Sequence, residues 1–370
     1  MLDALAGNLL TIVAFLGMLG LLVLVHELGH FLTAIRLGIK VDEFGFGYPP
    51  RMLVLFERKG VKYTLNWLPL GGFVRFSGDG EQVYGVGGLA AAAPWKKIVV
   101  LVAGPLMNLL LAIVIFIGLF LVRGVPTVLD GALISSVFPG TPAAAAEFRN
   151  GDVLVNLNGV PIRRDLDQIR TIAGENAGIP IPAVVERDGR QLTLTVVPGP
   201  WSYQDSSSAV GFGFSYGTNA SLQPASLPAA ISAGFFYTFD LLGRFIAGIG
   251  QMIGGLFGAN EPPPGGVAGV VGIARGTGEI IQRDGLFGFW QWTALISLNL
   301  FLVNLLPIPA LDGSHILFAL LEVVRRGRKI PPEKEAMVHA VGFVMLMGLM
   351  VIITISDVAQ WLSGAPVLGG

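Results

Sequence analysis

The chain has 370 residues, of which 53% are hydrophobic and 13% are charged, and its mean hydropathy is +0.68. A soluble protein carries about 25% charged residues, so this composition indicates a membrane protein. The net charge of −1 gives no case for a nucleic-acid partner, and the absence of cysteine excludes disulfides, thiolate zinc sites and a cysteine nucleophile.

The first apolar run contains no charged side chain from Ala4 to Val25. That length suffices for a helix to cross a bilayer, which takes roughly 20 residues. The run lacks the basic start and the small-residue cleavage site of a signal peptide. We therefore predict a retained transmembrane helix over about residues 6–33.

This helix carries the sequence His26-Glu27-Leu28-Gly29-His30 near its far end. Residues four apart lie on one face of a helix, so both imidazoles can reach one metal ion. Two histidines with this spacing and an adjacent glutamate form the HExxH pattern of zinc hydrolases, in which the glutamate is the general base. The alternative is a polar patch that packs between helices, but ionisable groups at this depth have few other satisfactory partners.

Residues 42–78 are predicted to form a membrane-associated β-sheet. Short alternating runs near 51–57, 62–68 and 72–77 are separated by Pro49-Pro50, by Gly60 and by Gly71-Gly72. An edge of such a sheet could pair with an extended peptide. The alternative is a connecting hairpin without a binding role.

A second transmembrane helix is predicted over about 97–122, after a Gly- and Ala-rich loop at 81–94. It contains Gly104-Pro105 and Asn108. Proline inside a membrane helix is tolerated where neighbouring groups satisfy the freed carbonyl. For Asn108 we favour a hydrogen bond between helices over a position facing the metal site.

Residues 126–200 form a predicted soluble α+β domain, because charges and turn signals return there. The Ser-, Gly- and Pro-containing segment 201–227 is interpreted as a linker. Within the domain, the patterns predict a helix through 164–174 and strands at 132–137, 153–157, 181–187 and 191–197.

The region 201–285 is predicted to hold this linker and one amphipathic or re-entrant helix. That helix, 228–257, is interrupted by Asp240, Arg244 and several glycines. The C-terminal membrane core, 286–370, follows with transmembrane helices over about 286–306 and 335–356. Between them, Pro307 and Pro309 break the helix and place Asp312 at a helix break.

Basic clusters at 36–62, 96–97 and 325–329 are predicted to be cytoplasmic. The N-terminus and the α+β domain are then outside, and the histidine pair and Asp312 share the cytoplasmic side. This geometry requires that 228–257 does not cross the membrane. If it crosses, Asp312 moves to the wrong face.

The chain resembles the site-2 protease family of intramembrane zinc metalloproteases, in the RseP-like branch that carries PDZ domains. Five stretches carry the resemblance: the HExxH sequence, Pro69 to Gly72, Gly104-Pro105 with Asn108, Gly269 to Ala274, and Asn304 to Gly313. A distant NxxPxPxLDG sequence paired with HExxH makes the match specific. The α+β domain resembles a single, circularly permuted PDZ domain.

The resemblance implies one Zn²⁺ per chain, bound by His26, His30 and Asp312, with Glu27 as general base. Asn304 would hydrogen-bond the substrate backbone or the oxyanion, and the sheet, including Gly71, Gly72 and Phe73, would hold the substrate as an added strand. Substrates would be single-span membrane proteins that another protease has already trimmed, such as anti-sigma factors or signal-peptide remnants.

Taken together, we predict a polytopic α-helical membrane protein with about four transmembrane helices, a membrane-associated β-sheet and an inserted extracytoplasmic PDZ-like domain. Its predicted function is intramembrane proteolysis in the inner (plasma) membrane, in contact with the lipid bilayer and with no nucleic acid. One alternative is a non-catalytic scaffold that binds peptides through the PDZ-like domain. Another is an ion or metal transporter, although the chain has no inverted repeat.

Overall fold

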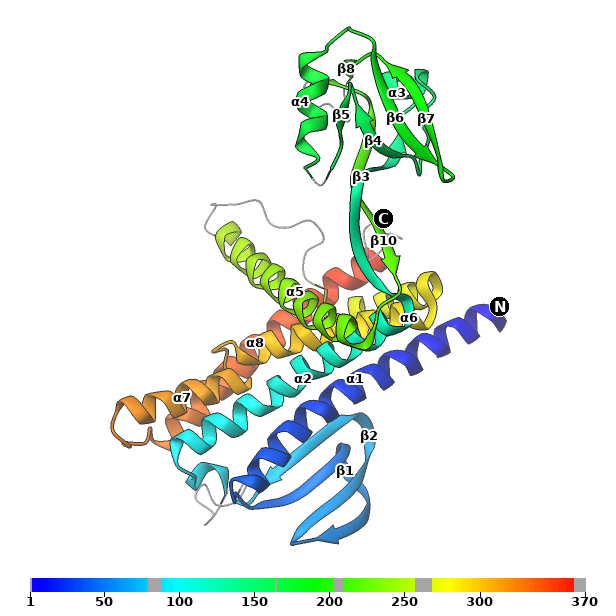
Figure 1. Ribbon diagram of the computed structural model, residues 1–370. Coiled ribbons are helices and arrows are strands. Elements are labelled where there is room, and N and C mark those ends of the chain that lie inside the picture. The colour runs from blue at the N-terminus through cyan, green and yellow to red at the C-terminus, as the bar shows by residue number, and fades with distance from the viewer. Residues whose placement is uncertain (1, 79–87, 164, 202–208, 257–267, 363–370) are drawn as a thin grey trace. The chain divides into compact units, whose positions relative to one another are not determined.

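The computed structural model describes residues 2–78, 88–163, 165–201, 209–256 and 268–362 (Figure 1). The chain forms two compact units. The first unit contains residues 1–122 and 227–370, and the second contains Arg123–Ser226. The second unit is thus inserted between two halves of the first.

The first unit is built on long apolar helices: α1 (Leu2–Arg36), α2 (Pro94–Arg123), α5 (Leu227–Leu256), α6 (Val270–Leu305), α7 (Asp312–Val324) and α8 (Pro332–Leu362). Among the described residues, five of them are long and apolar enough to span a membrane, and α7 is the exception. The sequence predicts about four spans, and α5 is the additional candidate. The short turn η1 (Leu89–Ala91) precedes α2, and most of the predicted loop before it lies outside the described residues.

Helix α6 differs from its prediction at its N-terminal side. A helix was expected to start near residue 286, but α6 begins at Val270. Gly285 interrupts it with a φ of 63°, which L side chains rarely adopt, so the predicted start coincides with a kink between two helical segments. The predicted helix thus corresponds to the second helical segment of α6, and an additional segment, 270–284, precedes the kink.

Helices α5 and α6 both begin at the same end of the helix bundle. His30 contacts Val100 and His26 contacts Asn108, so α1 and α2 are antiparallel. The ring of Tyr237 on α5 packs on Phe116 and Phe120 near the C-terminal end of α2. At that same end, the first residues of α6 meet the start of α1 and the end of α8: Gly278 lies against Thr11, and the backbone N–H groups of Gly269 and Gly272 donate to Asp357.

A long antiparallel hairpin, β1 (Val41–Arg58) and β2 (Val61–Phe76), packs against α1. Both strands bend, so residues 41–46 pair with 72–76 on one side and with 62–65 on the other, while 51–58 pair with 61–66. The predicted strands near 62–68 and 72–77 are two parts of β2, and residues 41–46 extend β1 beyond the predicted strand at 51–57. Residues 72–76 pair only with β1 within the described residues and form an edge of the sheet.

One buried carboxylate fixes this sheet. Glu43 is 2% exposed and accepts hydrogen bonds from Thr64 and Arg51, while Arg75 lies 3.2 Å away. Burial alone would raise the pKa of Glu43, but the hydrogen bonds from Arg51 and Thr64 outweigh it and hold the pKa below its ordinary value. Glu43 therefore joins the central strand segment to both of its neighbours, to one through Thr64 and to the other through Arg75.

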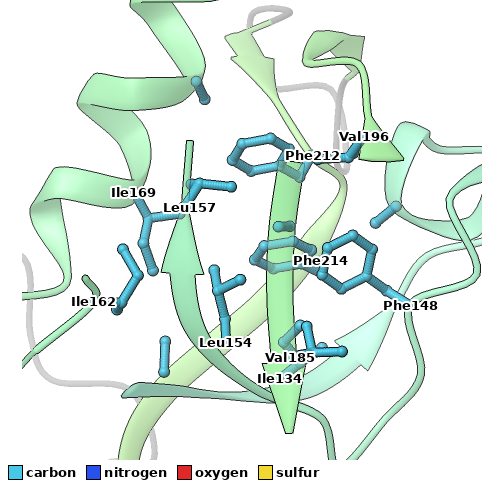
Figure 2. Packing of buried hydrophobic residues seen from close by; sticks show 14 of the residues in the cluster. Ile134, Phe148, Leu154, Leu157, Ile162, Ile169, Val185, Val196, Phe212 and Phe214 are labelled. Atoms are coloured by element: carbon cyan, nitrogen blue, oxygen red, sulfur yellow. The ribbon is translucent and has the colours of Figure 1, made fainter. Parts of the chain in front are cut away.

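In its described residues, the second unit has a six-stranded antiparallel sheet and two short helices. The strand order is β10-β3-β4-β6-β7, with β5 paired to β4, and β8 and β9 form a separate pair. Its core contains Ile134, Leu154, Val185 and the rings of Phe148, Phe212 and Phe214 (Figure 2). The elements are β3 (Val125–Val137), α3 (Pro142–Ala145), β4 (Val153–Leu157), β5 (Val160–Pro161), α4 (Asp167–Glu175), β6 (Ile181–Arg187), β7 (Arg190–Val196), β8 (Gly199–Trp201), β9 (Ala209–Gly211) and β10 (Phe214–Gln223).

The interpretation of 201–227 as a linker is wrong for its described part, and residues 202–208 lie outside the described residues. Strand β10 pairs with β3 from Phe214↔Val137 to Gln223↔Val125, so this segment completes the sheet. Phe212 and Phe214 are buried in the core. The unit consequently extends to Ser226 rather than ending at residue 200.

Candidate metal and catalytic site

His26 and His30 lie on successive turns of α1 and point the same way. Both are buried, with 8% and 6% exposure, and their Nε2 atoms are 3.1 Å apart. The rings meet edge to face with centroids 4.7 Å apart. The four-residue spacing read from the sequence thus brings both imidazoles to one point.

Asp312 reaches the same point from the first turn of α7. Its Oδ2 atom lies 2.9 Å from Nε2 of His26 and 3.4 Å from Nε2 of His30. The sharp turn before α7 depends on Gly313, because a Cβ there would lie 2.1 Å from the carbonyl oxygen of Leu306. The helix N-terminus also favours a negative charge at this position.

The positions of Nε2 of His26, Nε2 of His30 and Oδ2 of Asp312 suit the ligands of one divalent metal ion. Tetrahedral zinc with ligands at about 2.0–2.1 Å keeps neighbouring ligand atoms about 3.3 Å apart, close to the three separations found here. Oδ2 of Asp312 is buried and has no hydrogen-bond partner. A Cβ on Gly104 of α2 would lie 2.3 Å from Nε2 of His30 and 2.9 Å from Nε2 of His26. Glycine at 104 therefore keeps the space in front of the imidazoles open.

The Nδ1 atoms of both imidazoles, on the side of each ring away from the metal position, contact α2. Nδ1 of His30 donates to the carbonyl oxygen of Val100 at 2.8 Å, which leaves its Nε2 lone pair for the metal. Nδ1 of His26 lies 3.3 Å from Nδ2 of Asn108, whose Oδ1 is buried without a partner. The opposite amide rotamer lets Oδ1 accept the Nδ1–H of His26, and both groups are then satisfied.

Asn108 does both things that the sequence analysis weighed. We favoured a hydrogen bond between helices over a position facing the metal site, and its amide joins α2 to α1 by contacting a histidine of the HExxH sequence. It is 1% exposed, and its backbone carbonyl accepts a hydrogen bond from Ser297 of α6 at 2.8 Å. Asn108 therefore links α1, α2 and α6 at the level of the site.

Glu27 lies on the neighbouring face of α1 and opens into a cavity. The cavity has a volume of about 520 Å³ and is lined by Glu27, His30 and Asp312 together with residues of β2, α2, α7 and α8. The carboxylate of Glu27 interacts with the backbone of Val74 on the sheet edge. A carboxylate beside the three candidate ligands, in a space large enough for a peptide segment, is placed for proton transfer.

The predicted substrate-binding glycines lie where β2 docks on α1. A Cβ on Gly71 would lie 2.3 Å from Cβ of Val23, and a Cβ on Gly72 would lie 2.9 Å from the carbonyl oxygen of Gly45 and 3.3 Å from the side chain of Leu24. Phe73 pairs with Gly45 inside the sheet. These residues hold the edge segment against the turn of α1 that precedes His26.

Asn304 lies half-buried in the last turn of α6, one tight loop before Asp312. Within the described residues its amide makes no hydrogen bond. Among the described residues it forms no hydrogen bond with His26, His30 or Glu27.

Known proteins match this chain along nearly its whole length. The model of Peptidase family M50 matches residues 14–349. The Zinc metalloprotease RasP of Geobacillus kaustophilus is 30% identical over 95% of this chain and 98% of its own length. The Zinc metalloprotease RasP of Oceanobacillus iheyensis is 28% identical over 95% and 99%, and the Regulator of sigma-W protease RasP of Bacillus subtilis is 28% identical over 95% and 98%. The family match runs from within α1 to within α8 and contains the cluster of two buried histidines and a half-buried aspartate, and this chain belongs to Peptidase family M50.

Proposed function

We propose that this chain is a zinc metalloprotease of the membrane that cleaves a transmembrane segment of single-span proteins. The observation that carries this proposal is the convergence of His26, His30 and Asp312 beside Glu27. Membership of Peptidase family M50 and similarity to zinc metalloproteases along nearly the whole chain support the same activity.

One Zn²⁺ would be held by Nε2 of His26, Nε2 of His30 and a carboxylate oxygen of Asp312. When bound, zinc supplies a Lewis acid that polarises a carbonyl group and lowers the pKa of water to about 7. Glu27 takes a proton from the attacking water and returns it to the leaving amine. Val100 and Asn108 hold the two imidazoles in the tautomer that directs Nε2 to the metal.

The substrate must present an extended backbone, because a transmembrane helix keeps its peptide bonds in internal hydrogen bonds. The edge at residues 72–76 pairs only with β1 within the described residues, and Val74 of this edge lies beside Glu27. A substrate strand added to this edge would run along the cavity. Gly71, Gly72 and Phe73 would set the position of the edge, and Asn304 would bind the substrate backbone or the oxyanion.

The charge pattern supports an orientation in the inner (plasma) membrane. With the basic clusters on the cytoplasmic side, the hairpin and the loop after α7 would be cytoplasmic and the inserted α+β unit would be outside. Contacts of α5 and α6 at one end of the bundle favour an α5 that makes no net crossing. The α+β unit would act as a PDZ-like domain that controls access, either sterically or by binding a new C-terminus.

The substrates would be membrane proteins that another protease has already shortened, such as anti-sigma factors or signal-peptide remnants. The name of the Bacillus subtilis relative, Regulator of sigma-W protease, supports a role in sigma-factor regulation.

The test uses the purified full chain in detergent with a single-span reporter protein. Glu27→Gln is expected to lower cleavage at least about 10³-fold while one zinc remains bound, because the base is lost and the ligands stay. Glu175→Gln, an exposed change on α4, is the matched control and keeps full activity. Cleavage by Glu27→Gln at the wild-type rate would contradict the assigned role.

A further inference from the structure

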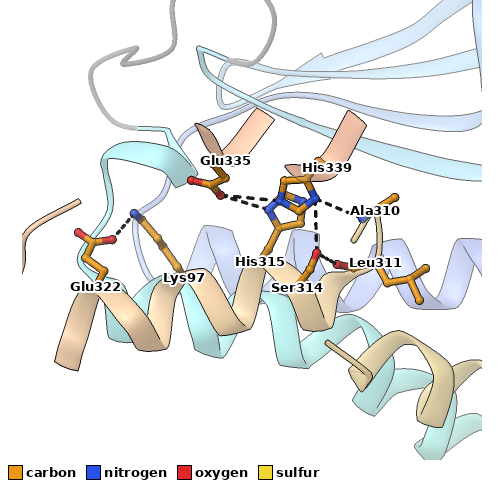
Figure 3. A network of polar contacts seen from close by, with 8 residues as sticks. All are labelled: Lys97, Ala310, Leu311, Ser314, His315, Glu322, Glu335 and His339. Carbon is orange, nitrogen blue, oxygen red and sulfur yellow. Dashed lines mark hydrogen bonds and ion pairs between the residues drawn. The ribbon is translucent and has the colours of Figure 1, made fainter. Parts of the chain in front are cut away.

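A second group of potential metal ligands lines the same cavity. His315 comes from α7, one turn after Asp312, and Glu335 and His339 come from the first turns of α8 (Figure 3). One ligand atom of each residue lies within 4.8 Å of the others. The mechanism above uses none of these three side chains.

The three side chains crowd together without hydrogen-bonding one another. Oε1 of Glu335 is 3.7 Å from Nδ1 of His315 and 4.0 Å from Nε2 of His339, both beyond hydrogen-bond distance. The two rings stack with centroids 4.1 Å apart. Nε2 of His339 is buried and has no hydrogen-bond partner. A cation between these atoms would satisfy the unpaired nitrogen and explain the spacing.

Two groups lie within hydrogen-bond distance of Nδ1 of His339, and each is compatible with a different tautomer of the ring. Ser314 donates its hydroxyl proton to the carbonyl oxygen of Leu311, so its Oγ, 3.4 Å away, can accept a proton from Nδ1. That tautomer turns the Nε2 lone pair toward Glu335 and His315. In the other tautomer the backbone N–H of Ala310 donates to Nδ1 at 3.2 Å, and Nε2 carries the proton.

The charge around the group also suits a cation. Lys97 lines the cavity, but its ammonium is paired with Glu322 at 2.9 Å, at the far end of α7. Glu335 makes its ion-pair contacts with the two histidines. Two imidazoles and one carboxylate are a ligand set that suits zinc and neighbouring divalent transition metals.

We propose that His315, Glu335 and His339 form a second divalent transition-metal site that joins α7 to α8. It binds more weakly than the first site, because its ligand atoms are farther apart and its side chains are 46%, 36% and 16% exposed. Metal binding selects the Ser314-bonded tautomer of His339. Because α7 also carries Asp312, the second ion fixes the helix that supplies the aspartate.

The experiment titrates Zn²⁺ into untagged, metal-stripped full chain in detergent against a chromogenic chelator. Wild type is expected to bind two equivalents, one tight and one at least about 10-fold weaker. His315→Gln with His339→Gln should lose the weak equivalent and keep the tight one, and Glu335→Gln should weaken it. Glu333→Gln, an exposed change in the same turn of α8, should keep both.

His26→Gln with Asp312→Asn should lose the tight equivalent and keep the weak one, so the two sites fail independently. Elution as a single species by size exclusion confirms that each variant is folded. Binding of one equivalent by wild type, or of two by the His315→Gln/His339→Gln variant, would overturn the second site and leave the proteolytic site unaffected.

Discussion

The carboxylate of Asp312 lies 2.9 Å from Nε2 of His26, although the two residues belong to opposite ends of the chain. Helix α1 fixes the histidine and the tight turn before α7 fixes the aspartate. The inserted unit, Arg123–Ser226, and helices α2, α5 and α6 all lie between them in sequence. The site therefore exists only when both halves of the membrane core are packed together.

Gly104→Ala should disable the site without unfolding α2. The new methyl group would lie 2.3 Å from Nε2 of His30, so the imidazole must move away from the metal position. Displacements of about 1 Å cost roughly 100-fold in catalysis, and we expect a loss of that order in kcat/KM together with weaker zinc binding. Gly118→Ala on the same helix meets nothing within 4 Å and is the control. Equal behaviour of the two variants would refute this role for Gly104.

Asn108→Ala should weaken zinc binding by about 10–100-fold, as expected for loss of a group that orients a ligand histidine. The change removes the only side-chain amide that contacts Nδ1 of His26 among the described residues. Asn108→Asp should keep much of the affinity, because a carboxylate also accepts the Nδ1–H. Competition with a chelator of known affinity measures both. Unchanged affinity in Asn108→Ala would show that Asn108 only joins helices.

Gly71→Ala should reduce proteolysis by at least about 10-fold while zinc stays bound. The position has a φ of +94°, and a Cβ there would lie 2.3 Å from Cβ of Val23, so β2 must lift from α1. Gly60→Ala has a similar φ of +80° but meets nothing within 4 Å, which separates backbone strain from lost docking. The measurement is kcat/KM on a single-span reporter beside metal content. If both variants lose the same activity, strain alone explains the effect.

The second unit should depend on a buried ion pair. Asp152 is fully buried and accepts hydrogen bonds from Nε and Nη2 of Arg187 at 2.6 and 2.7 Å. Breaking such a pair by changing one partner costs about 3 kcal/mol, so Asp152→Asn should make this unit unfold at lower urea concentration. Pulse proteolysis of the full chain measures it. Asp188→Asn, an exposed change of the same kind, should have no comparable effect.

The same pair should give this unit a sensitivity to acid. Burial would raise the pKa of Asp152, but the hydrogen bonds from Arg187 and from the backbone of Arg149 outweigh it, and the pKa lies below the ordinary value of 3.8. A lowered pKa contributes stability that is complete above the unfolded value and is lost as the pH falls through the folded value. The unit should therefore lose stability below about pH 4, and Asp152→Asn should show a flatter pH profile. A parallel profile for the two proteins would contradict this.

Sequence patterns predicted the parts of the site that depend on local spacing. His26 and His30 lie on one face of a helix whatever packs against that helix. Pro307 and Pro309 predict the helix break that precedes Asp312. The role of Asn108 could not be found in this way, because the face that α2 turns toward α1 depends on tertiary packing. The spacing of Glu335 and His339, again four residues, was a signal for the proposed second ligand group. Their proximity to His315 could not be predicted, because it depends on how the loop between α7 and α8 brings the two helices together.

Non-local pairing explains the main errors in the fold. Strand β10 has the small and polar composition of a linker, and its role follows only from its partner β3, far earlier in the chain. The start of α6 was placed at its kink, because Asp284 and Gly285 end the apolar pattern there. Helix α5 has the length and composition of a span, so the interpretation of 228–257 as a helix that does not cross stays a prediction.

X-ray absorption spectroscopy at the zinc edge, on full chain loaded with one equivalent of Zn²⁺, tests the central claim most directly. We predict nitrogen and oxygen neighbours at about 2.0–2.1 Å, with outer-shell scattering from two imidazoles, and loss of the tightly bound ion in Asp312→Asn. A spectrum without imidazole scattering, or one that is the same in wild type and in Asp312→Asn at full zinc retention, would contradict the assignment of His26, His30 and Asp312 as the metal site.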